Sequence, residues 1–220
     1  MKTGSLFFLF LMFGNIHPLI AQRLYNEGAV VYNIVVSTGT DKPQAADLLD
    51  GARMRIWIKG NQSRTETKSL LGTTVTLQDA RTGSAVVLNE YGDQKVMIMM
   101  TQEEYQERNL KFKNMKIDYH QQTKIILGYN CKLAIVTLAD SSRFSVYYAP
   151  DLVFQNKSVS KQFDQLPGFP LEYESELGAM KVTYVAEKLS FEPIPAALFD
   201  VPRSGFRRMT YEELRRTQRN

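Results

Sequence analysis

Apolar residues recur at every second position in many short segments of this chain. Residues 53–58 are the clearest case, because Met54, Ile56 and Ile58 alternate with two arginines and a tryptophan. A period of two is the pattern of a β-strand with one buried face. Comparable segments lie at 30–36, 73–79, 84–90, 94–101, 131–138, 143–149, 171–176 and 180–191. We therefore expect a mainly β domain of about ten short strands with minor helix.

Short turns join these segments, and none of the connections carries a long helical pattern. Several turns combine glycine with Asp or Asn, as in Tyr91-Gly92-Asp93, which is typical of hairpins. Parallel neighbours in a βαβ unit need a crossover of about a dozen or more residues. The sheet is therefore predicted to be antiparallel. Pro167 followed by Gly168 indicates a type II turn, in which glycine supplies the positive φ.

Helical patches are few and short. We expect them near residues 45–50, 101–109, 158–166 and 210–219. The last patch begins with Thr210, and Glu213 follows three residues later. This spacing is that of a capping box, in which each side chain bonds the other residue's backbone N–H.

The first 21 residues have the order of a secretory signal peptide. Lys2 gives a positive start, residues 6–13 form an uninterrupted apolar run, and Ala21 is the small residue before the expected cut. The run is much shorter than the ~20 residues of a spanning helix; a retained anchor is the alternative. Gln22 follows the cut, where an acylated lipoprotein has cysteine. We expect a single mature domain, residues 22–220, in the periplasm or cell envelope.

The formal net charge of the chain is only +4, which does not point to a nucleic-acid partner. The basic excess is local, because six arginines but only two glutamates lie in residues 203–219. A basic tail fits peripheral contact with anionic lipid headgroups. The plainer interpretation is a solvated helix end, where cations interact favourably with the helix dipole.

The expected mature sequence carries few residues of the types that catalysis uses. Its one histidine is His120 and its one cysteine is Cys131, whereas a zinc site needs three or four ligands. Glu172, Glu174 and Glu176 share one strand face, but a glycosidase needs two carboxylates across a cleft. We therefore predict no catalytic residue, no metal and no cofactor. Cys131 stands in an apolar strand and is predicted to be buried rather than reactive.

Residues 96–100 depart from the alternation, because they are apolar at every position. Such a strand has to be covered on both faces. A second core layer is the usual cover. A ligand pocket is the other interpretation, which the three methionines of residues 97–100 favour because flexible thioethers suit irregular apolar ligands.

Several short motifs resemble those of a family of exported bacterial proteins, some of which are known as GLPGLI-type proteins. In chain order these motifs are residues 124–132 (KIILGYNCK), 146–152 (VYYAPDL), 166–172 (LPGFPLE) and 199–202 (FDVP). The resemblance covers most of residues 25–205. This chain differs in one extra apolar residue before Gly128 and in Phe169-Pro170, where the naming motif has Leu-Ile.

Proteins of this kind look like relatives of the LolA/LolB-type lipoprotein carriers. The resemblance implies an open, curved antiparallel half-barrel, whose concave apolar face is plugged by short helices and binds acyl chains. Function does not follow from architecture alone, so more than one hypothesis stays open.

The first hypothesis is a secreted, non-enzymatic envelope protein that binds a lipid or an acylated partner in the concave face. The residues expected to line that face are Met54, Ile56, Ile58, Met97 and Met99. The alternative is a protein-interaction or structural module of the periplasm with a filled core and no small ligand. A hydrolase that uses strand carboxylates ranks third.

Overall fold

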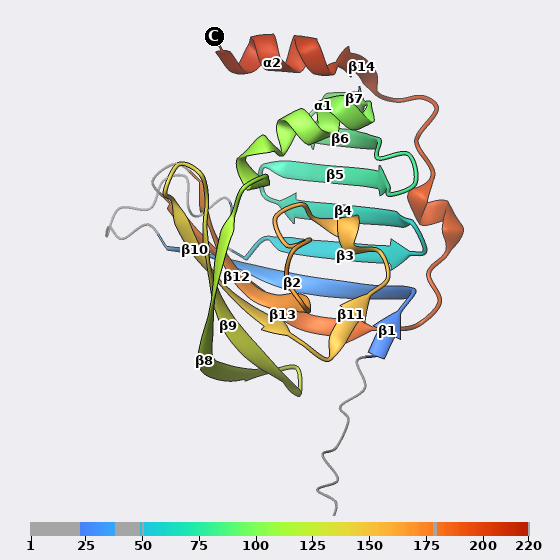
Figure 1. Ribbon diagram of the computed structural model, residues 1–220. Helices are drawn as coiled ribbons and strands as arrows, with labels where there is room; N and C mark the ends of the chain where they lie inside the picture. The colour runs from blue at the N-terminus through green and yellow to red at the C-terminus, as the bar shows by residue number, and fades with distance from the viewer. Residues whose placement is uncertain (1–22, 38–48, 50, 178–179, 220) are drawn as a thin grey trace, which may run out of the picture.

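The computed structural model describes residues 23–37, 49, 51–177 and 180–219. Its main element is a twelve-stranded sheet that is strongly curved and not closed into a barrel (Figure 1). This confirms the predicted fold class of a mainly β, curved sheet. In spatial order its strands are β14 (Arg207–Thr210), β7 (Gln94–Met100), β6 (Ala85–Tyr91), β5 (Gly72–Asp79), β4 (Gln62–Ser69), β3 (Arg53–Lys59), β2 (Glu27–Ser37), β13 (Met180–Ser190), β12 (Phe169–Leu177), β10 (Arg143–Ala149), β9 (Tyr129–Thr137) and β8 (Lys116–Ile126).

Two strand pairs depart from the antiparallel expectation. The edge strand β14 pairs parallel with β7, and β1 (Arg23–Tyr25) pairs parallel with β11 (Leu152–Phe154) in a separate small sheet. Both pairs join segments that are far apart in sequence, so neither needs the helical crossover that the prediction excluded.

The helices are short, as expected. They are α1 (Gln102–Arg108), α2 (Tyr211–Arg219) and the 3₁₀ turns η1 (Leu110–Phe112), η2 (Lys157–Val159) and η3 (Ala196–Phe199). The predicted capping box is present, because Glu213 N–H donates to Thr210 Oγ1 at 3.1 Å and Thr210 N–H donates to Glu213 Oε2 at 2.7 Å. Within the described residues, no helix is long and apolar enough to cross a membrane.

Some expectations lie outside the described residues or are met only in part. The expected signal peptide falls outside them, and so does the helical patch at 45–50 except residue 49. The patch expected at 158–166 is one 3₁₀ turn followed by irregular turns.

The alternation in β3 sorts its side chains onto two faces of the sheet. Met54, Ile56 and Ile58 are buried, whereas the residues between them are exposed or half-buried. We call the face that carries these three residues the inner face and the opposite one the outer face. Residues that are paired across neighbouring strands point to the same face of the sheet. The strand pairing therefore shows which residues of each strand from β2 to β7 lie on the inner face. One inner row consists of Val30, Ile56, Thr65, Thr76, Val87 and Ile98.

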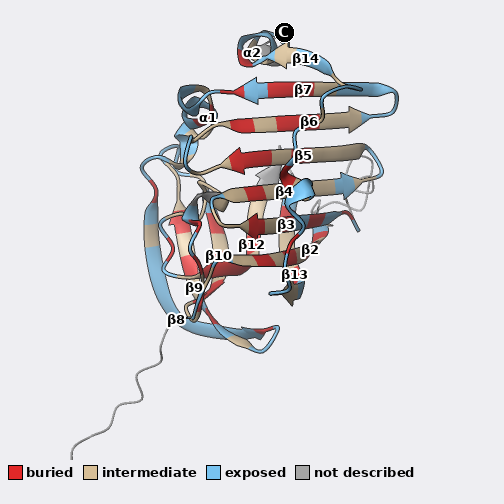
Figure 2. Cartoon of the chain, turned by 90° about the vertical axis from the view of Figure 1, so that its right-hand side faces the viewer, coloured by how far each residue is buried: buried red, intermediate tan, exposed pale blue. Residues whose placement is uncertain are grey.

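The inner face carries the main core. Buried side chains of β2, β3, β9, β10, β12 and β13 form one apolar cluster. A smaller cluster on β6 and β7 includes Ile98 and Met100 and packs against Tyr105 of α1 and Tyr211 of α2. In Figure 2 the buried residues follow these strands, while the edge strand β8 is mostly exposed.

Two connections cross the sheet, one on each face. The inner strap, residues 150–168, joins β10 to β12 and contains β11 and η2 (Figure 1). The outer strap, residues 191–206, follows β13 and leads to β14. Its backbone carbonyls accept hydrogen bonds from Lys59 at 2.7 Å and from Arg64 at 3.3 Å, and its Phe206 packs beside Met97. At Met97 the apolar strand β7 is thus covered on both faces by protein, which favours the second-layer interpretation there, whereas Met99 on the outer face is 54% exposed.

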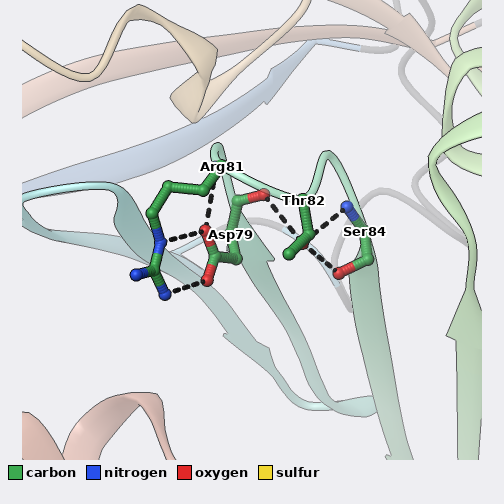
Figure 3. A network of polar contacts seen from close by, with 4 residues as sticks. All are labelled: Asp79, Arg81, Thr82 and Ser84. Carbon is green, nitrogen blue, oxygen red and sulfur yellow. Dashed lines mark hydrogen bonds and ion pairs between the residues drawn. The ribbon is translucent and has the colours of Figure 1, made fainter.

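Polar side chains fix the hairpin turn between β5 and β6 (Figure 3). Asp79 accepts two hydrogen bonds from the guanidinium of Arg81, at 3.0 and 3.3 Å, and one from its backbone N–H at 2.9 Å. These bonds hold the pKa of the Asp79 carboxyl below its usual value. Thr82 Oγ1 lies 2.7 Å from Ser84 Oγ and accepts a further bond from Ser84 N–H at 3.3 Å.

The predicted type II turn at Pro167-Gly168 is wrong. Gly168 does not have a positive φ. Its backbone instead lies so close to β10 that an added Cβ would stand 2.1 Å from the carbonyl oxygen of Ala149. Glycine is needed here for close backbone approach and not for conformational freedom.

Candidate functional site

A cavity of about 210 Å³ lies between the inner strap and the inner face of the sheet. Its floor comes from β2 to β5, its roof from the inner strap, and Tyr105 and Asn109 at α1 line it as well. Ligand pockets in proteins usually have about 300–1,000 Å³. This cavity is therefore large enough for a short apolar group or for part of a longer one.

Most of the cavity wall is apolar and aromatic. Met54 and Ile56 form part of the floor, and Phe154, Phe163 and Phe169 come from the inner strap and the start of β12. The aromatic rings of the wall contact one another. Phe154 and Phe169 lie 5.0 Å apart between centroids, and Phe163 lies 4.6 Å from Tyr173, both with tilted or edge-on geometry. Such contacts stabilise aromatic pairs beyond the burial of their area.

Two buried tyrosines face this wall. Tyr32 donates its hydroxyl hydrogen to the carbonyl of Pro170 at 2.6 Å. Tyr173 donates to Met54 Sδ at 3.8 Å, which is a weak acceptor. Burial raises the pKa of both hydroxyls well above its ordinary value, because the phenolate would lose its hydration.

The polar members of the wall lie on the strap, beside α1, and on β4 and β5. Lys161 and Asp164 of the strap form an ion pair at 3.6 Å. Asn109 donates from Nδ2 to the backbone carbonyl of Tyr105 at 2.7 Å. Thr65 of β4 and Thr76 of β5 complete the floor.

The five residues that sequence reasoning assigned to one binding face are divided by the structure. Met54 and Ile56 line the cavity, and Ile58 lies on the same face but is fully buried in the core. Met97 and Met99 are on the outer face. The pairing runs Arg55–Glu66–Val75–Leu88–Met97, so Met97 shares a face with Arg55 and not with Ile56.

The placement of Met97 and Met99 corrects the expectation that both belong to the apolar concave face. Met97 is buried against Leu88 and Phe206, whereas Met99 is 54% exposed. Alternation within each strand gave the two faces correctly. Alternation does not show how distant strands pair with one another. If the pairing of two strands shifts by one residue, every side chain of one strand moves to the opposite face of the sheet.

Sequence reasoning missed the inner strap, which supplies most of the cavity roof. Its buried residues are Leu152, Phe154 and Leu166; the first two alternate with Val153 in β11, but a strand of three residues is too short for its period to be recognised in the sequence. The available signal was the density of apolar residues in a segment for which only a short helical patch, residues 158–166, was expected. Loops normally run over the surface, so buried aromatic residues in a loop indicate that it crosses a core.

The residues considered for catalysis do not line the cavity. Cys131 is buried and free, and burial raises the pKa of its thiol to about 11. Glu172 pairs with Lys124 at 2.6 Å, and Glu174 pairs with Lys181 at 2.6 Å. His120 lies on the exposed strand β8. In the part of the chain that the structure describes, no group of three His, Cys, Asp or Glu side chains lies close enough to hold a metal ion.

A comparison with protein-family models finds no match, and a comparison with curated proteins finds none either. Among solved structures the fold is similar to that of PNGF-II, with a TM-score of 0.51, 14% identity, and coverage of 87% of this chain and 32% of that one. This chain thus spans about a third of the length of PNGF-II. Since the identity is low, the likeness concerns the fold alone.

Two smaller proteins are also similar to this chain. The Mycobacterium tuberculosis lipoprotein LppX gives a TM-score of 0.39 and 11% identity, over 76% of this chain and 88% of that one. A LolA superfamily protein from Nitrosomonas europaea gives 0.35 and 11%, over 80% and 90%. Neither assigns a family or a function to this chain, and its membership of the GLPGLI-type family stays a prediction.

Proposed function

We propose that this protein binds the apolar chain of a lipid or of an acylated partner in the cavity under the inner strap, and that it catalyses no reaction. The observation that supports this most directly is the cavity itself. It lies on the inner face of an open curved sheet, and its wall is built mainly from Met54, Ile56 and aromatic rings. Affinity would come from burial, at about 25 cal/mol for each Å² of apolar surface removed from water before the costs of association.

The size of the cavity limits what it holds. At about 210 Å³ it accepts a short chain or one end of a long chain, with the remainder outside. A carrier of the LolA/LolB kind, with an acyl chain as cargo, is the specific form of this proposal. The resemblance of the sequence motifs and the open half-barrel both agree with it.

The proposed location is the periplasm or cell envelope, reached through a cleaved signal peptide. The expected mass of the exported protein is that of residues 22–220, and an intact mass of the full chain would contradict cleavage. Peripheral contact with the membrane is assigned to Arg203, Arg207 and Arg208, which are exposed. Arg215 and Arg216 are already in ion pairs with glutamates, each at 2.6 Å.

The test fills the cavity by a single substitution. Val159→Trp puts an indole into the space under the inner strap, because Val159 lines the cavity. The matched control is Val35→Trp, since Val35 is 44% exposed and lies on β2 on the outer face. Uptake is measured with N-phenyl-1-naphthylamine, whose fluorescence rises in apolar sites, and native mass spectrometry detects lipid that co-purifies with the protein.

We expect the unmodified protein and Val35→Trp to take up the probe and Val159→Trp to lose it. A folded protein that excludes the probe and carries no lipid would contradict the proposal. That result would favour the alternative of an interaction module with a filled core.

A further inference from the structure

The cavity has two chemically different sides. One side is apolar and aromatic, with Met54, Ile56 and Phe154. The opposite side, under α1, carries hydroxyl and amide groups from Thr65, Thr76, Tyr105 and Asn109; the pairing of the strands places it there, because β4 and β5 come next to β3 in the sheet. A ligand that fills this space touches both sides.

Thr65 and Thr76 are direct cross-strand partners on the inner face, so their Cβ atoms lie about 4.5–5.5 Å apart. Both are half-buried and both line the cavity. Neither hydroxyl has a hydrogen-bond partner among the described residues, although each can donate one bond and accept two. Thr74, on the same strand and the same face, contrasts with them because it donates to Asn89 at 3.1 Å.

The charges around the cavity restrict what these hydroxyls can receive. The cavity residues that come from the sheet, from α1 and from the residue after it are Tyr32, Met54, Ile56, Thr65, Thr76, Phe169, Pro170, Tyr173, Tyr105 and Asn109. None of them is cationic; the two lysines that line the cavity, Lys157 and Lys161, come from the inner strap, and Lys161 is paired with Asp164 at 3.6 Å. A carboxylate or phosphate bound by the two hydroxyls would lie on the wall that has no cation of its own, which is costly away from water. An uncharged carbonyl oxygen accepts two hydrogen bonds and needs no counter-charge.

We infer that Thr65 and Thr76 form a recognition site for an uncharged carbonyl group, that of an ester or an amide, attached to the apolar chain. This inference rests on the proposed function and names the chemical class of its ligand. The chain lies against the aromatic side, and the two hydroxyls donate to the carbonyl oxygen. A plain hydrocarbon of the same length fills the space but leaves both hydroxyls without a partner.

The experiment compares two ligands of matched size in displacing N-phenyl-1-naphthylamine from the full mature chain. Pentyl acetate carries the ester, and n-nonane does not. The variant Thr65→Val/Thr76→Val keeps the shape of the floor and removes both hydroxyls. Thr73→Val is the matched control, because Thr73 is on β5 but faces the outer side of the sheet. Circular dichroism and thermal unfolding verify that each variant is folded.

The ratio of the two affinities separates recognition from hydrophobicity, since the ligands' own transfer energies cancel between variants. We expect the double variant to shift this ratio by about tenfold toward n-nonane, the effect of about two ordinary hydrogen bonds. Thr73→Val should leave the ratio unchanged.

An equal ratio in the unmodified protein and the double variant would overturn the inference while leaving the proposed function intact. If neither the probe nor either ligand binds, the proposed function itself fails. A ratio that moves equally in Thr73→Val and in the double variant would show a general effect on the sheet and would also overturn the inference.

Discussion

Replacing Tyr32 with phenylalanine tests whether one buried hydrogen bond holds the chain at the end of the inner strap to the sheet. The Tyr32 hydroxyl donates to the carbonyl of Pro170 at 2.6 Å, and the tyrosine is 0% exposed. Pro170 stands two residues after the strap ends, at the start of β12. The substitution therefore removes a short bond between β2 and β12 and leaves the shape of the ring unchanged.

The expected loss of folding stability follows because the acceptor, the carbonyl of Pro170, belongs to a buried residue. Removing one partner from a buried hydrogen bond costs about 1–3 kcal/mol, because the remaining group stays dehydrated. Tyr173→Phe is the internal comparison. Its hydroxyl reaches only Met54 Sδ at 3.8 Å, a weak acceptor, so we expect a loss below about 1 kcal/mol.

Urea unfolding at neutral pH measures both variants. We expect a lower midpoint for Tyr32→Phe with an unchanged slope, since the same surface becomes exposed on unfolding. Equal losses for the two variants, or no loss for Tyr32→Phe, would refute the argument, because burial and bond geometry would then not determine the cost.

Three further predictions concern the core. Burial raises the pKa of both buried tyrosines above its usual value of about 10, so only the unfolded chain ionises them near pH 10. Stability should be complete below that pH and fall above it; a urea midpoint that stays constant from about pH 9 to 11 would contradict this. Met97→Ala should cost about 2–5 kcal/mol and leave probe uptake unchanged, since Met97 is on the outer face; lost uptake in the folded variant would contradict that placement. Gly168→Ala should lower stability by about 3 kcal/mol, because its Cβ would meet a backbone oxygen at 2.1 Å. Thermal unfolding measures it. The comparison is Gly92→Ala, where an added Cβ meets nothing and the positive φ of 57° is the source of strain; a loss no greater than that one would refute the clash.

The strands with one apolar face could be predicted from the sequence, because burial of that face is what forms them. In β3 the buried and exposed positions follow the predicted alternation. The exceptions are instructive. The strand β4 reads QSRTETKS, and only Ser63 in it is buried. The strand β4 is held in the sheet by backbone pairing with β3 and β5. Backbone pairing does not require apolar side chains, so the sequence of β4 shows no apolar alternation.

The edge strand β8 was missed for a different reason. Most of its side chains are exposed, as expected of an edge where charged residues prevent pairing with another chain. A strand of this kind has no burial signal to detect. The sheet therefore has more strands than the roughly ten that alternation identified.

The candidate site could be predicted only in part. Met54 and Ile56 were identified because the inner face of a single strand is visible in its own sequence. Met97 was assigned to the wrong face, because its correct placement needed the register across β4, β5 and β6, which depends on turns and pairings that no single segment records. The roof needed the path of the inner strap, which is set by long-range packing of its aromatic residues.

The two straps have a consequence for how a ligand reaches the cavity. Strands β3 and β4 are hydrogen-bonded to neighbours on both edges, and the outer strap lies against them through Lys59 and Arg64. Separating these strands would break ladder bonds and the bonds to the outer strap together. Moving the inner strap breaks fewer backbone bonds. For the ligand proposed above, movement of the inner strap is therefore the exit route that breaks the fewest bonds, and a substitution at Phe154 or Leu166 would change the release rate even where equilibrium affinity stays the same.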